Sequence, residues 1–176
     1  MITIKNLLLI AGTGTRSGKT TMACRIIREF REFKIIGIKI TPHFHETTSG
    51  LLTVSEKSGY SIYEETDPES FKDTSRMLEA GASRVYFAKV CDDQLFKVFT
   101  EIMKLVPEGA PVICESPALR HFVEPGAFII MTSNTINKYK DISNLQKLHH
   151  AMFQLEELDG IDTLPLEFKD GSWFYN

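Results

Sequence analysis

The sequence has few cysteines, and their placement argues against both a disulfide framework and a zinc site. Cys24, Cys91 and Cys114 are odd in number, lie far apart, and each sits in an apolar stretch. None of them has the close spacing that zinc ligands require. We therefore predict free, buried thiols in a reducing compartment.

An excess of positive charge is also missing. The formal net charge is −3, the sequence pI is about 6.0, and the chain contains no long basic run. Neutralising a nucleic-acid backbone takes clustered Lys and Arg, so nucleic acid is not expected as a main partner. The apolar run near the N-terminus is too short to span a membrane, and the Met1–Ile4 start does not resemble a signal peptide. We expect a cytoplasmic protein without membrane contact.

What the chain does contain is enough apolar sequence for a sizeable core. With 176 residues, 43% of them hydrophobic, it suits a single domain over residues 1–176. Apolar strand patterns and helical patterns follow one another along the sequence. This order predicts an α/β protein with a mostly parallel sheet. The expected strands are Leu7–Ala11, Lys34–Thr41, Arg84–Val90, Pro111–Glu115 and Gly126–Thr132, and the expected helices begin at Lys19, Lys72 and Asp92.

The stretch Leu7–Thr21 reads as a buried strand, a glycine-rich turn and a helix start. Its glycines allow the backbone to curl until several N–H groups point into one concavity, and the helix dipole adds attraction for an anion. Lys19 can reach the outer phosphates of a nucleotide, and the Thr20 hydroxyl is placed to bind Mg²⁺. The predicted phosphate-binding residues are Gly12, Thr13, Gly14, Thr15, Arg16, Ser17, Gly18, Lys19, Thr20 and Thr21.

This stretch departs from the strict phosphate-loop pattern at one position. The pattern G-x-x-x-x-G-K-[ST] requires glycine at position 13, where this chain has Thr13. The plain alternative is an ordinary loop that contains Gly-Lys-Thr. The flanking strand and helix favour the phosphate-binding interpretation.

Two charged residues stand at the ends of otherwise apolar strands. The carboxyl ends of parallel strands are where open α/β sheets bind ligands, so Lys39 is expected there, the alternative being a lysine that extends to solvent at the sheet edge. Glu115 ends another buried strand, where a carboxylate can hold Mg²⁺ through water or orient an attacking group. We interpret both as active residues, and we expect Ser116 and Arg120 to face the same cleft.

The segment Lys72–Ala82 predicts a short helix that ends near Gly81. Asp73 is a natural N-cap for it. An equally supported alternative places Asp73 and Arg76 near phosphate or Mg²⁺.

His43 and His45 alternate in an extended segment, as a pair of metal ligands could. No nearby Cys, Asp or Glu supplies an obvious third ligand, so a loop lining the substrate side is favoured. The next segment, Leu51–Thr66, predicts a β-hairpin around Ser58-Gly59. It is interpreted either as a flap over the site or as an edge hairpin with no role in binding.

The C-terminal part offers two further patterns. Residues Asn137–Asp141 invite comparison with the guanine-reading N-K-x-D motif, but their spacing is one residue too long. The apolar stripe that follows predicts instead a helix starting at Asp141, with His149 and His150 as ordinary helix residues. Its members are Ile142, Leu145, Leu148, Met152, Leu155 and Leu158. Beyond it, Leu166–Tyr175 predicts a hairpin turning at Asp170-Gly171 and packed down by Trp173.

These motifs resemble a known group of proteins. The loop GTGTRSGKTT is similar to the phosphate loops of dethiobiotin synthetase and its relatives, where Thr follows the first glycine, and Lys39 and Glu115 match the same pattern. More closely, GIKITPHFH and KDTSRMLEAGA resemble segments of molybdopterin-guanine dinucleotide biosynthesis protein B. The resemblance covers Leu7–Thr132.

The resemblance implies a three-layer P-loop NTPase fold and a homodimer. It assigns Mg²⁺ to Thr20 and Glu115, and places Lys19, Lys39, Asp73 and Glu115 at the reacting side. The implied function is binding of a purine nucleotide, GTP in preference to ATP, with weak hydrolysis in support of molybdenum-cofactor maturation and alongside a maturation enzyme.

Two other functions stay open. One is an ATP-dependent ligase or kinase of the dethiobiotin synthetase type acting on a small carboxylate, although Ser116-Pro117 replaces that enzyme's glycine-rich continuation. The other is a P-loop fold that binds nucleotide without hydrolysing it.

Overall fold

Strands and helices follow one another along the chain, which a computed structural model describes over residues 1–42, 47–136 and 139–176. The strands are β1 (Ile2–Gly12), β2 (Ile36–Thr41), β3 (Leu51–Lys57), β4 (Tyr60–Glu65), β5 (Arg84–Val90), β6 (Val112–Glu115), β7 (Val123–Thr132), β8 (Ala151–Gln154), β9 (Leu166–Lys169) and β10 (Ser172–Tyr175). The helices are α1 (Lys19–Glu29), α2 (Asp73–Glu79), α3 (Leu95–Met103) and α4 (Ser143–Gln146), with short 3-10 turns η1 (Arg31–Phe33), η2 (Asp92–Gln94), η3 (Pro117–His121) and η4 (Leu155–Gly160).

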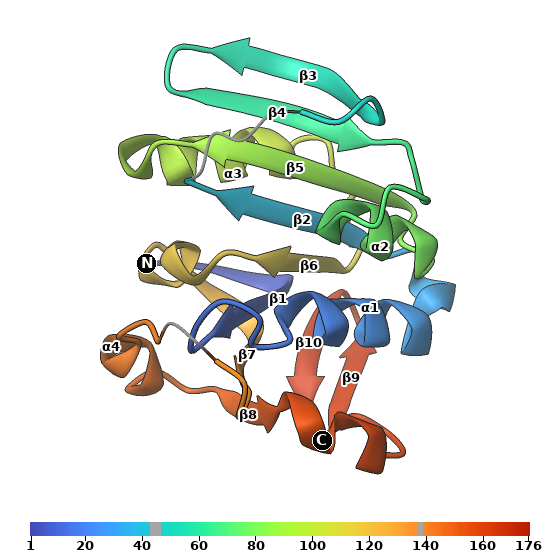
Figure 1. Cartoon of the computed structure of the whole chain (residues 1–176), viewed down its shortest axis with the longest axis vertical. Coiled ribbons are helices and arrows are strands. Elements are labelled where there is room, and N and C mark those ends of the chain that lie inside the picture. Colours follow the sequence, from blue (N-terminus) through green and yellow to red (C-terminus); the bar gives the residue numbers. More distant parts are fainter. Residues whose placement is uncertain (43–46, 137–138) are drawn as a thin grey trace.

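The main sheet is mostly parallel, as the sequence predicts. It has eight strands in the order β3-β4-β5-β2-β6-β1-β7-β8, and every neighbouring pair from β5 to β8 runs parallel (Figure 1). The strands β3 and β4 continue it antiparallel at one edge. A separate two-stranded sheet, β9 and β10, forms the predicted C-terminal hairpin.

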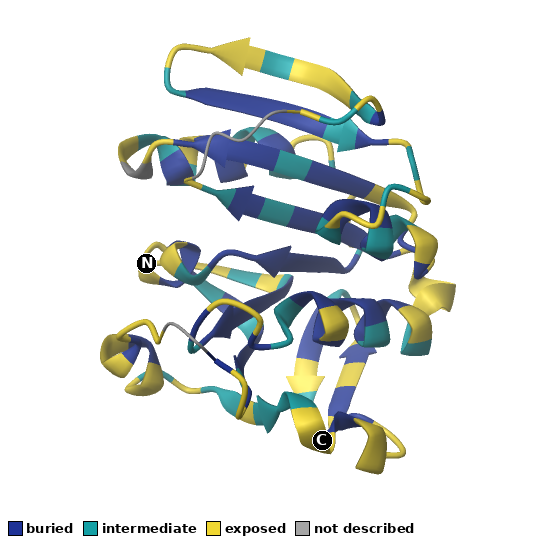
Figure 2. Ribbon diagram, viewed as in Figure 1, coloured by how far each residue is buried: buried dark blue, intermediate teal, exposed yellow. Residues whose placement is uncertain are grey.

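Apolar side chains cover both faces of the sheet, as expected for parallel strands that are apolar on both sides. The central strands β2 and β6 are accordingly buried along most of their length (Figure 2). On one face α1, α2 and the β9–β10 hairpin pack against the sheet through residues such as Ile26, Met77 and Trp173. On the other face α3, η3 and α4 pack through residues such as Phe99 and Leu145. The chain therefore has a layer of structure on each side of a central sheet.

The predicted hairpin over Leu51–Thr66 forms, but it is not a flap. Strand β4 pairs with β5, and its Tyr60 and Ile62 are 1% exposed. Strand β3 occupies the edge beyond it and exposes Leu52 and Val54. Backbone pairing with β5 holds the hairpin in the plane of the sheet, which corrects the flap interpretation in favour of the edge hairpin.

The long helix predicted from Asp141 onward is wrong. Helix α4 has only four residues, and the chain then turns into strand β8, which pairs in parallel with β7. The edge strand β7 offers backbone N–H and C=O groups that need partners. Residues 151–154 therefore pair with β7 as a strand, although the apolar residues around them have helical spacing. His149 and His150 precede β8, where the rings contact Tyr175 and Phe128.

The C-terminal hairpin is fixed by aromatic packing. Trp173 is 1% exposed and contacts the Phe30 ring edge-on, with 5.2 Å between the centroids. Phe168 packs against Trp173 at 5.0 Å. The predicted role of Trp173 is confirmed.

The cysteines match their prediction in part. Cys24, Cys91 and Cys114 are free, and Cys24 and Cys114 are buried. Burial raises the pKa of Cys24 to about 11. Cys91 is exposed, which corrects the expectation that all three thiols are buried.

The described part of the chain holds no helix with the length and apolar character that a membrane crossing requires.

A bulge between β1 and β7 requires glycine at position 126. The strand register jumps between Ile4 and Leu8, and a Cβ atom on Gly126 would lie 2.1 Å from the Lys5 carbonyl oxygen. We predict that G126A lowers the free energy of unfolding by about 1–3 kcal/mol or more. G160A is the matched control, since no described residue apart from its chain neighbours lies within 4 Å of the added Cβ. Denaturant unfolding measures both, and equal losses in the two variants would contradict the prediction.

Candidate functional site

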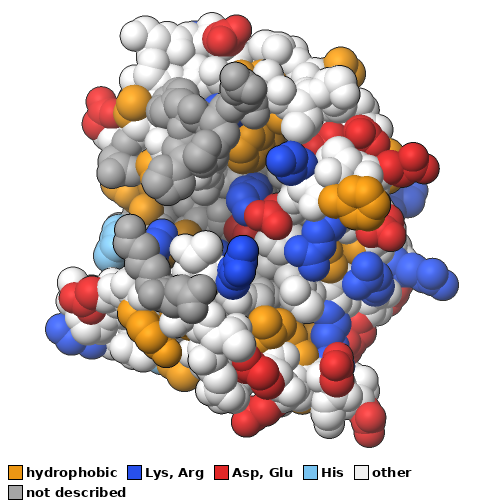
Figure 3. All heavy atoms as spheres, viewed as in Figure 1, with side chains coloured by type: hydrophobic (Ala, Val, Ile, Leu, Met, Phe, Trp, Pro, Cys, Tyr) orange, Lys and Arg blue, Asp and Glu red, His pale blue; other side chains and the backbone are white. Residues whose placement is uncertain are grey.

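The candidate site is a cleft at the carboxyl ends of β1, β2 and β6. These strands run parallel, so the residues that end them meet at one edge of the sheet, and the order of strands places β6 between β1 and β2. The cleft has a volume of about 560 Å³, and charged side chains gather at its borders (Figure 3). Its lining includes most of the predicted site residues: Gly12, Gly14, Thr15, Arg16, Ser17, Gly18, Lys19, Thr20, Thr21, Lys39, Asp73, Arg76 and Glu115.

The glycine-rich loop, residues 12–18, forms a tight turn between β1 and α1. A Cβ atom at Gly12 would lie 2.1 Å from the Ser17 hydroxyl oxygen, so any larger residue at position 12 would force the Ser17 side chain to move. Gly18 has φ of 88° and immediately precedes α1. Arg16 also takes a left-handed conformation, with φ of 62°. The sequence prediction of a curled loop leading into a helix at Lys19 is confirmed.

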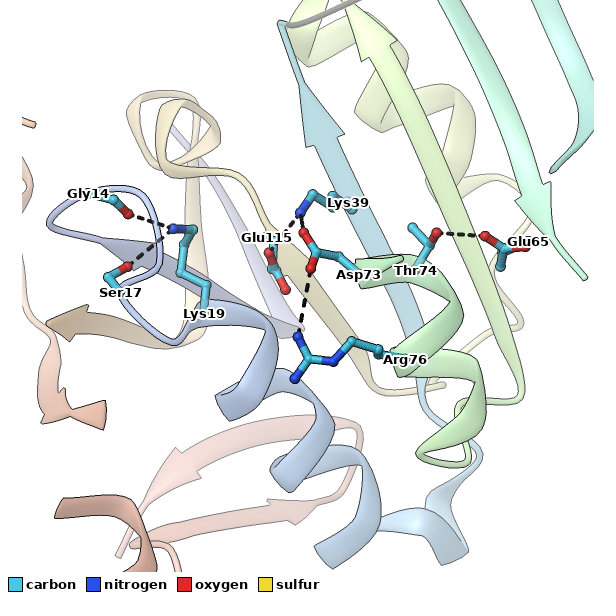
Figure 4. Close-up of polar contacts among 9 residues, drawn as sticks. All are labelled: Gly14, Ser17, Lys19, Lys39, Glu65, Asp73, Thr74, Arg76 and Glu115. Atoms are coloured by element: carbon cyan, nitrogen blue, oxygen red, sulfur yellow. Dashed lines mark hydrogen bonds and ion pairs between the residues drawn. The ribbon is translucent and has the colours of Figure 1, made fainter. Parts of the chain in front are cut away.

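Lys19 reaches back into the turn that carries it. Its ammonium donates hydrogen bonds to the Gly14 carbonyl oxygen at 3.0 Å and the Ser17 hydroxyl at 3.2 Å (Figure 4). Burial lowers the pKa of Lys19, and the charges of Lys39 and Lys140 lower it further. The charge of Glu115 acts in the opposite direction and raises the pKa. The hydrogen-bond partners of this cation are neutral oxygens, so an anion beside the loop would give it a counter-charge.

Across the cleft, Lys39 lies between two carboxylates. Its ammonium forms an ion pair with Asp73 and lies 3.6 Å from a carboxylate oxygen of Glu115. Burial acts to lower the pKa of Lys39, but Glu115 and Asp73 outweigh it and raise the pKa. Burial alone would raise the pKa of Asp73. The net shift is downward, because the carboxylate is stabilised by Lys39, Thr20 and Arg76. The three predicted residues therefore form one charged cluster, and Lys39 is not at a solvent edge.

Glu115 is the buried member of this cluster. It is 3% exposed, and its Oε1 atom has no hydrogen-bond partner within the described chain. Burial raises its pKa, and Lys39, the Thr20 hydroxyl and Lys19 act against that rise. The Thr20 hydroxyl also favours the ionised form of Asp73 and lowers its pKa.

This donor set fits a hard divalent cation shared with a ligand. Mg²⁺ prefers oxygen ligands, and it is commonly held by one or two carboxylates together with substrate phosphates. Thr20 and the unpartnered oxygen of Glu115 supply such groups. A site built from protein ligands alone does not form: over the described ranges, no group of three or more His, Cys, Asp or Glu side chains is placed to hold a metal ion.

Asp73 is not the N-cap that the sequence suggests. Lys72 precedes the first helical residue, and Asp73 begins α2 and turns its carboxylate to Lys39. The next residue, Thr74, anchors the helix by donating a hydrogen bond of 2.7 Å to buried Glu65 at the end of β4 (Figure 4). Asp73 therefore lines the cleft beside Lys39, and the capping interpretation is wrong.

A second segment, missed by the site prediction, lies against the glycine-rich loop. The Lys140 backbone N–H donates to the Thr13 carbonyl oxygen at 2.8 Å, and Tyr139 forms a β-bridge with Gly14. Lys140 lines the cleft together with Leu155, which packs against Gly18. Only the likeness to N-K-x-D drew attention to this segment in the sequence. Asn137, Lys138, His43 and His45 lie outside the described residues.

Arg120 is not in the cleft. Its side chain is 1% exposed, pairs with Glu124 at 2.7 Å and donates to the Val123 carbonyl oxygen at 2.9 Å. Its guanidinium also lies over the ring of Phe128. Ser116 is buried and does not line the cleft, where Pro117 takes part instead. Both positions belong to the packing around η3, which corrects their predicted role.

The burial of Glu115 predicts a pH dependence of stability. Its pKa is raised from the ordinary value of 4.5, so between 4.5 and the raised pKa the folded protein holds a proton that the unfolded chain has lost. Folding stability therefore falls as the pH rises through this window. In metal-free buffer we expect E115Q to gain stability relative to the wild type as the pH rises above 4.5.

Denaturant unfolding at several pH values measures this difference. The control is E79Q, which changes an exposed side chain on α2. The interpretation of Glu115 as a buried carboxyl group would be contradicted if the difference in unfolding free energy between E115Q and the wild type did not change with pH. A change of the same size in E79Q would contradict it as well.

Comparison with known proteins gives no match: none of the protein-family models, the curated proteins or the solved structures corresponds to this chain.

Proposed function

We propose that the cleft binds a nucleoside triphosphate with Mg²⁺, and that the glycine-rich loop is a P-loop. The observation that supports this most directly is Lys19, whose ammonium is held by a carbonyl and a hydroxyl of a tight loop at the start of a helix. A backbone curled around a lysine at a helix N-terminus is a general solution for binding phosphate.

The charges of the cleft suit a polyphosphate. Arg16, Lys19 and Lys140 border the loop side of the cleft, whereas both carboxylates of its lining stand beside Lys39. Phosphate oxygens at the loop would accept hydrogen bonds from Lys19 and from backbone N–H groups. Lys140, held beside the loop by its bond to Thr13, would add a further positive charge.

Thr20 and Glu115 would hold Mg²⁺, since both carry oxygen donors and Glu115 has an unpartnered one. The bound ion would neutralise charge on the phosphates and polarise the bond to the terminal phosphoryl group. Lys39 would lie at the reacting side, and Asp73 would hold its ammonium in place. Because two carboxylates already balance the charge of Lys39, we expect it to stabilise a transferred phosphoryl group weakly and hydrolysis to be slow.

The resemblance to molybdopterin-guanine dinucleotide biosynthesis protein B extends the proposal. On that basis the nucleotide is a purine nucleotide, GTP in preference to ATP. The protein is a cytoplasmic homodimer that assists molybdenum-cofactor maturation together with a maturation enzyme. The guanine preference is carried by this resemblance alone.

A ligase or kinase that transfers phosphate from ATP to a small carboxylate is the second candidate. It is favoured by the extent of the cleft, which continues beyond the loop along Thr41, Pro42 and Arg76. Such an enzyme would turn over rapidly with ATP and its carboxylate substrate, whereas the first candidate binds GTP tightly and hydrolyses it slowly. Steady-state turnover therefore separates the two.

Lys19 provides the direct test of nucleotide binding. Replacing Lys19 with Ala removes a charge-assisted hydrogen bond to phosphate, so we expect the affinity for Mg²⁺–GTP to fall by at least about 10-fold. Titration calorimetry measures the affinity, with K104A, an exposed lysine outside the cleft, as the matched control. Unchanged binding in K19A would falsify the P-loop assignment.

Thr20 provides the test of the metal. Nucleotide that binds the folded state raises the melting temperature by mass action, and we expect GTP to raise it more than ATP and both to need Mg²⁺. T20A should abolish the Mg²⁺-dependent part of the shift, and T20S, which keeps the hydroxyl, should retain it. A Mg²⁺-dependent shift in T20A equal to that of the wild type would exclude Thr20 as a ligand.

A further inference from the structure

The wall of the cleft opposite the glycine-rich loop carries an arginine that the nucleotide assignment does not use. Arg76 extends from α2 toward the start of α1, and in Figure 4 its guanidinium lies below Asp73, with Glu115 between Asp73 and Lys19. The charged groups with the largest effects on Lys19 are Glu115, Lys39, Lys140 and Asp73, not Arg76. Arg76 therefore stands apart from the loop lysine while bordering the same cleft.

The guanidinium of Arg76 is poorly saturated by its neighbours. Its Nη2 atom lies 3.4 Å from the Thr21 hydroxyl oxygen and its Nη1 atom lies 3.8 Å from a carboxylate oxygen of Asp73. Both distances exceed those of well-formed hydrogen bonds to nitrogen donors, and a guanidinium has five N–H donors. The side chain is 40% exposed. Its donors are thus available to a ligand in the cleft.

The neighbouring cation cannot take that place. Lys39 lies beside Arg76 on this wall, but Asp73 and Glu115 both pair with its ammonium. Asp73 is shared, and its ion pair with Lys39 is the closer contact. Among the described residues, Arg76 therefore pairs only with a carboxylate that it shares with Lys39, and at the longer distance. The Thr21 hydroxyl accepts from Arg76 and still has its own proton to donate.

We propose that Arg76 and Thr21 form a subsite for an oxyanion, the carboxylate or phosphate group of a second ligand that binds beside the nucleotide. The proposal rests on the proposed function, which assigns the loop wall to the triphosphate, and it moves Thr21, a residue of α1, from the predicted phosphate-binding set to the second ligand. A planar guanidinium matches the two oxygens of such a group. The subsite is held in place because Thr74, two residues before Arg76, bonds to buried Glu65.

The experiment titrates two small anions into protein saturated with Mg²⁺ and a non-hydrolysable GTP analogue, so that the loop is already filled. Inorganic phosphate and malonate are the probes, and their relative affinities show whether phosphate or carboxylate is preferred. Protein-detected NMR of the 20.0 kDa chain follows each titration. We expect saturable shifts at Arg76 and Thr21 with at least one of the two anions.

The variants locate the charge that binds. R76Q should weaken binding of the preferred anion by about 10-fold or more, because a charge-assisted hydrogen bond is lost. The same variant should bind the GTP analogue with an affinity within about twofold of the wild-type value. R76K, which keeps the charge without the planar fork, should lie between R76Q and wild type. R28Q is the matched control, since Arg28 is an exposed arginine of α1 outside the cleft. Thermal unfolding verifies that the variants are folded.

Three results would overturn the subsite: no saturable shift with either anion, an equal loss in R76Q and R28Q, or a loss of nucleotide affinity in R76Q with anion binding intact. The last would assign Arg76 to the triphosphate. Failure of the proposed function looks different, because nucleotide binding would then be unchanged in K19A while anion binding, measured without nucleotide, still depends on Arg76.

Discussion

The parallel register of β1, β6 and β2 is the constraint on which the candidate site depends. In this register Glu115 is the partner of Ile10 on one side and of Lys39 on the other, so one carboxylate lies beside both the strand that leads into the glycine-rich loop and the strand that carries the second lysine. A shift of one residue would turn Lys39 or Glu115 toward the opposite face of the sheet. The apolar residues that cover both faces of these strands hold the register, because any slip would expose them or create voids.

This arrangement places opposite charges where burial makes them costly. Glu115 is buried with one oxygen unpartnered, and Lys39 is held by two carboxylates of which only Glu115 lies in the sheet. A core built for stability alone would place apolar side chains here, since buried ion pairs contribute little net stability. Retaining them suits a site in which Glu115 and Thr20 would coordinate a metal ion and Lys19 would donate hydrogen bonds to a polyphosphate. Removing the carboxylates and ammonium groups of the cluster from water has an energetic cost. The same removal from water leaves these groups free to bind a ligand, which is their proposed function.

The sequence predicted what local patterns determine and missed what distant partners determine. A strand, a glycine turn and a helix start are neighbours in the chain, so the loop from Gly12 to Gly18 could be located from its own residues. Lys39 and Glu115 were identified because a charge at the end of an apolar strand stands out wherever that strand lies. Arg120 was misplaced because its partners, Glu124 and the Phe128 ring, compete with the cleft for its charge, and no local pattern records that competition. The helix predicted beyond Asp141 failed because the free edge of β7 captures residues 151–154 as a strand.

The two walls of the cleft are therefore built in different ways. The loop wall is formed mainly by contiguous residues whose conformation follows from glycines and a helix start, with Lys140 added beside them. The opposite wall depends on α2, a helix of seven residues, which is too short to be stable alone. Long-range contacts position it: Asp73 with Lys39, and Thr74 with buried Glu65 on β4. The edge hairpin consequently contributes to the site without touching it, because β4 supplies the anchor of the helix that presents Arg76.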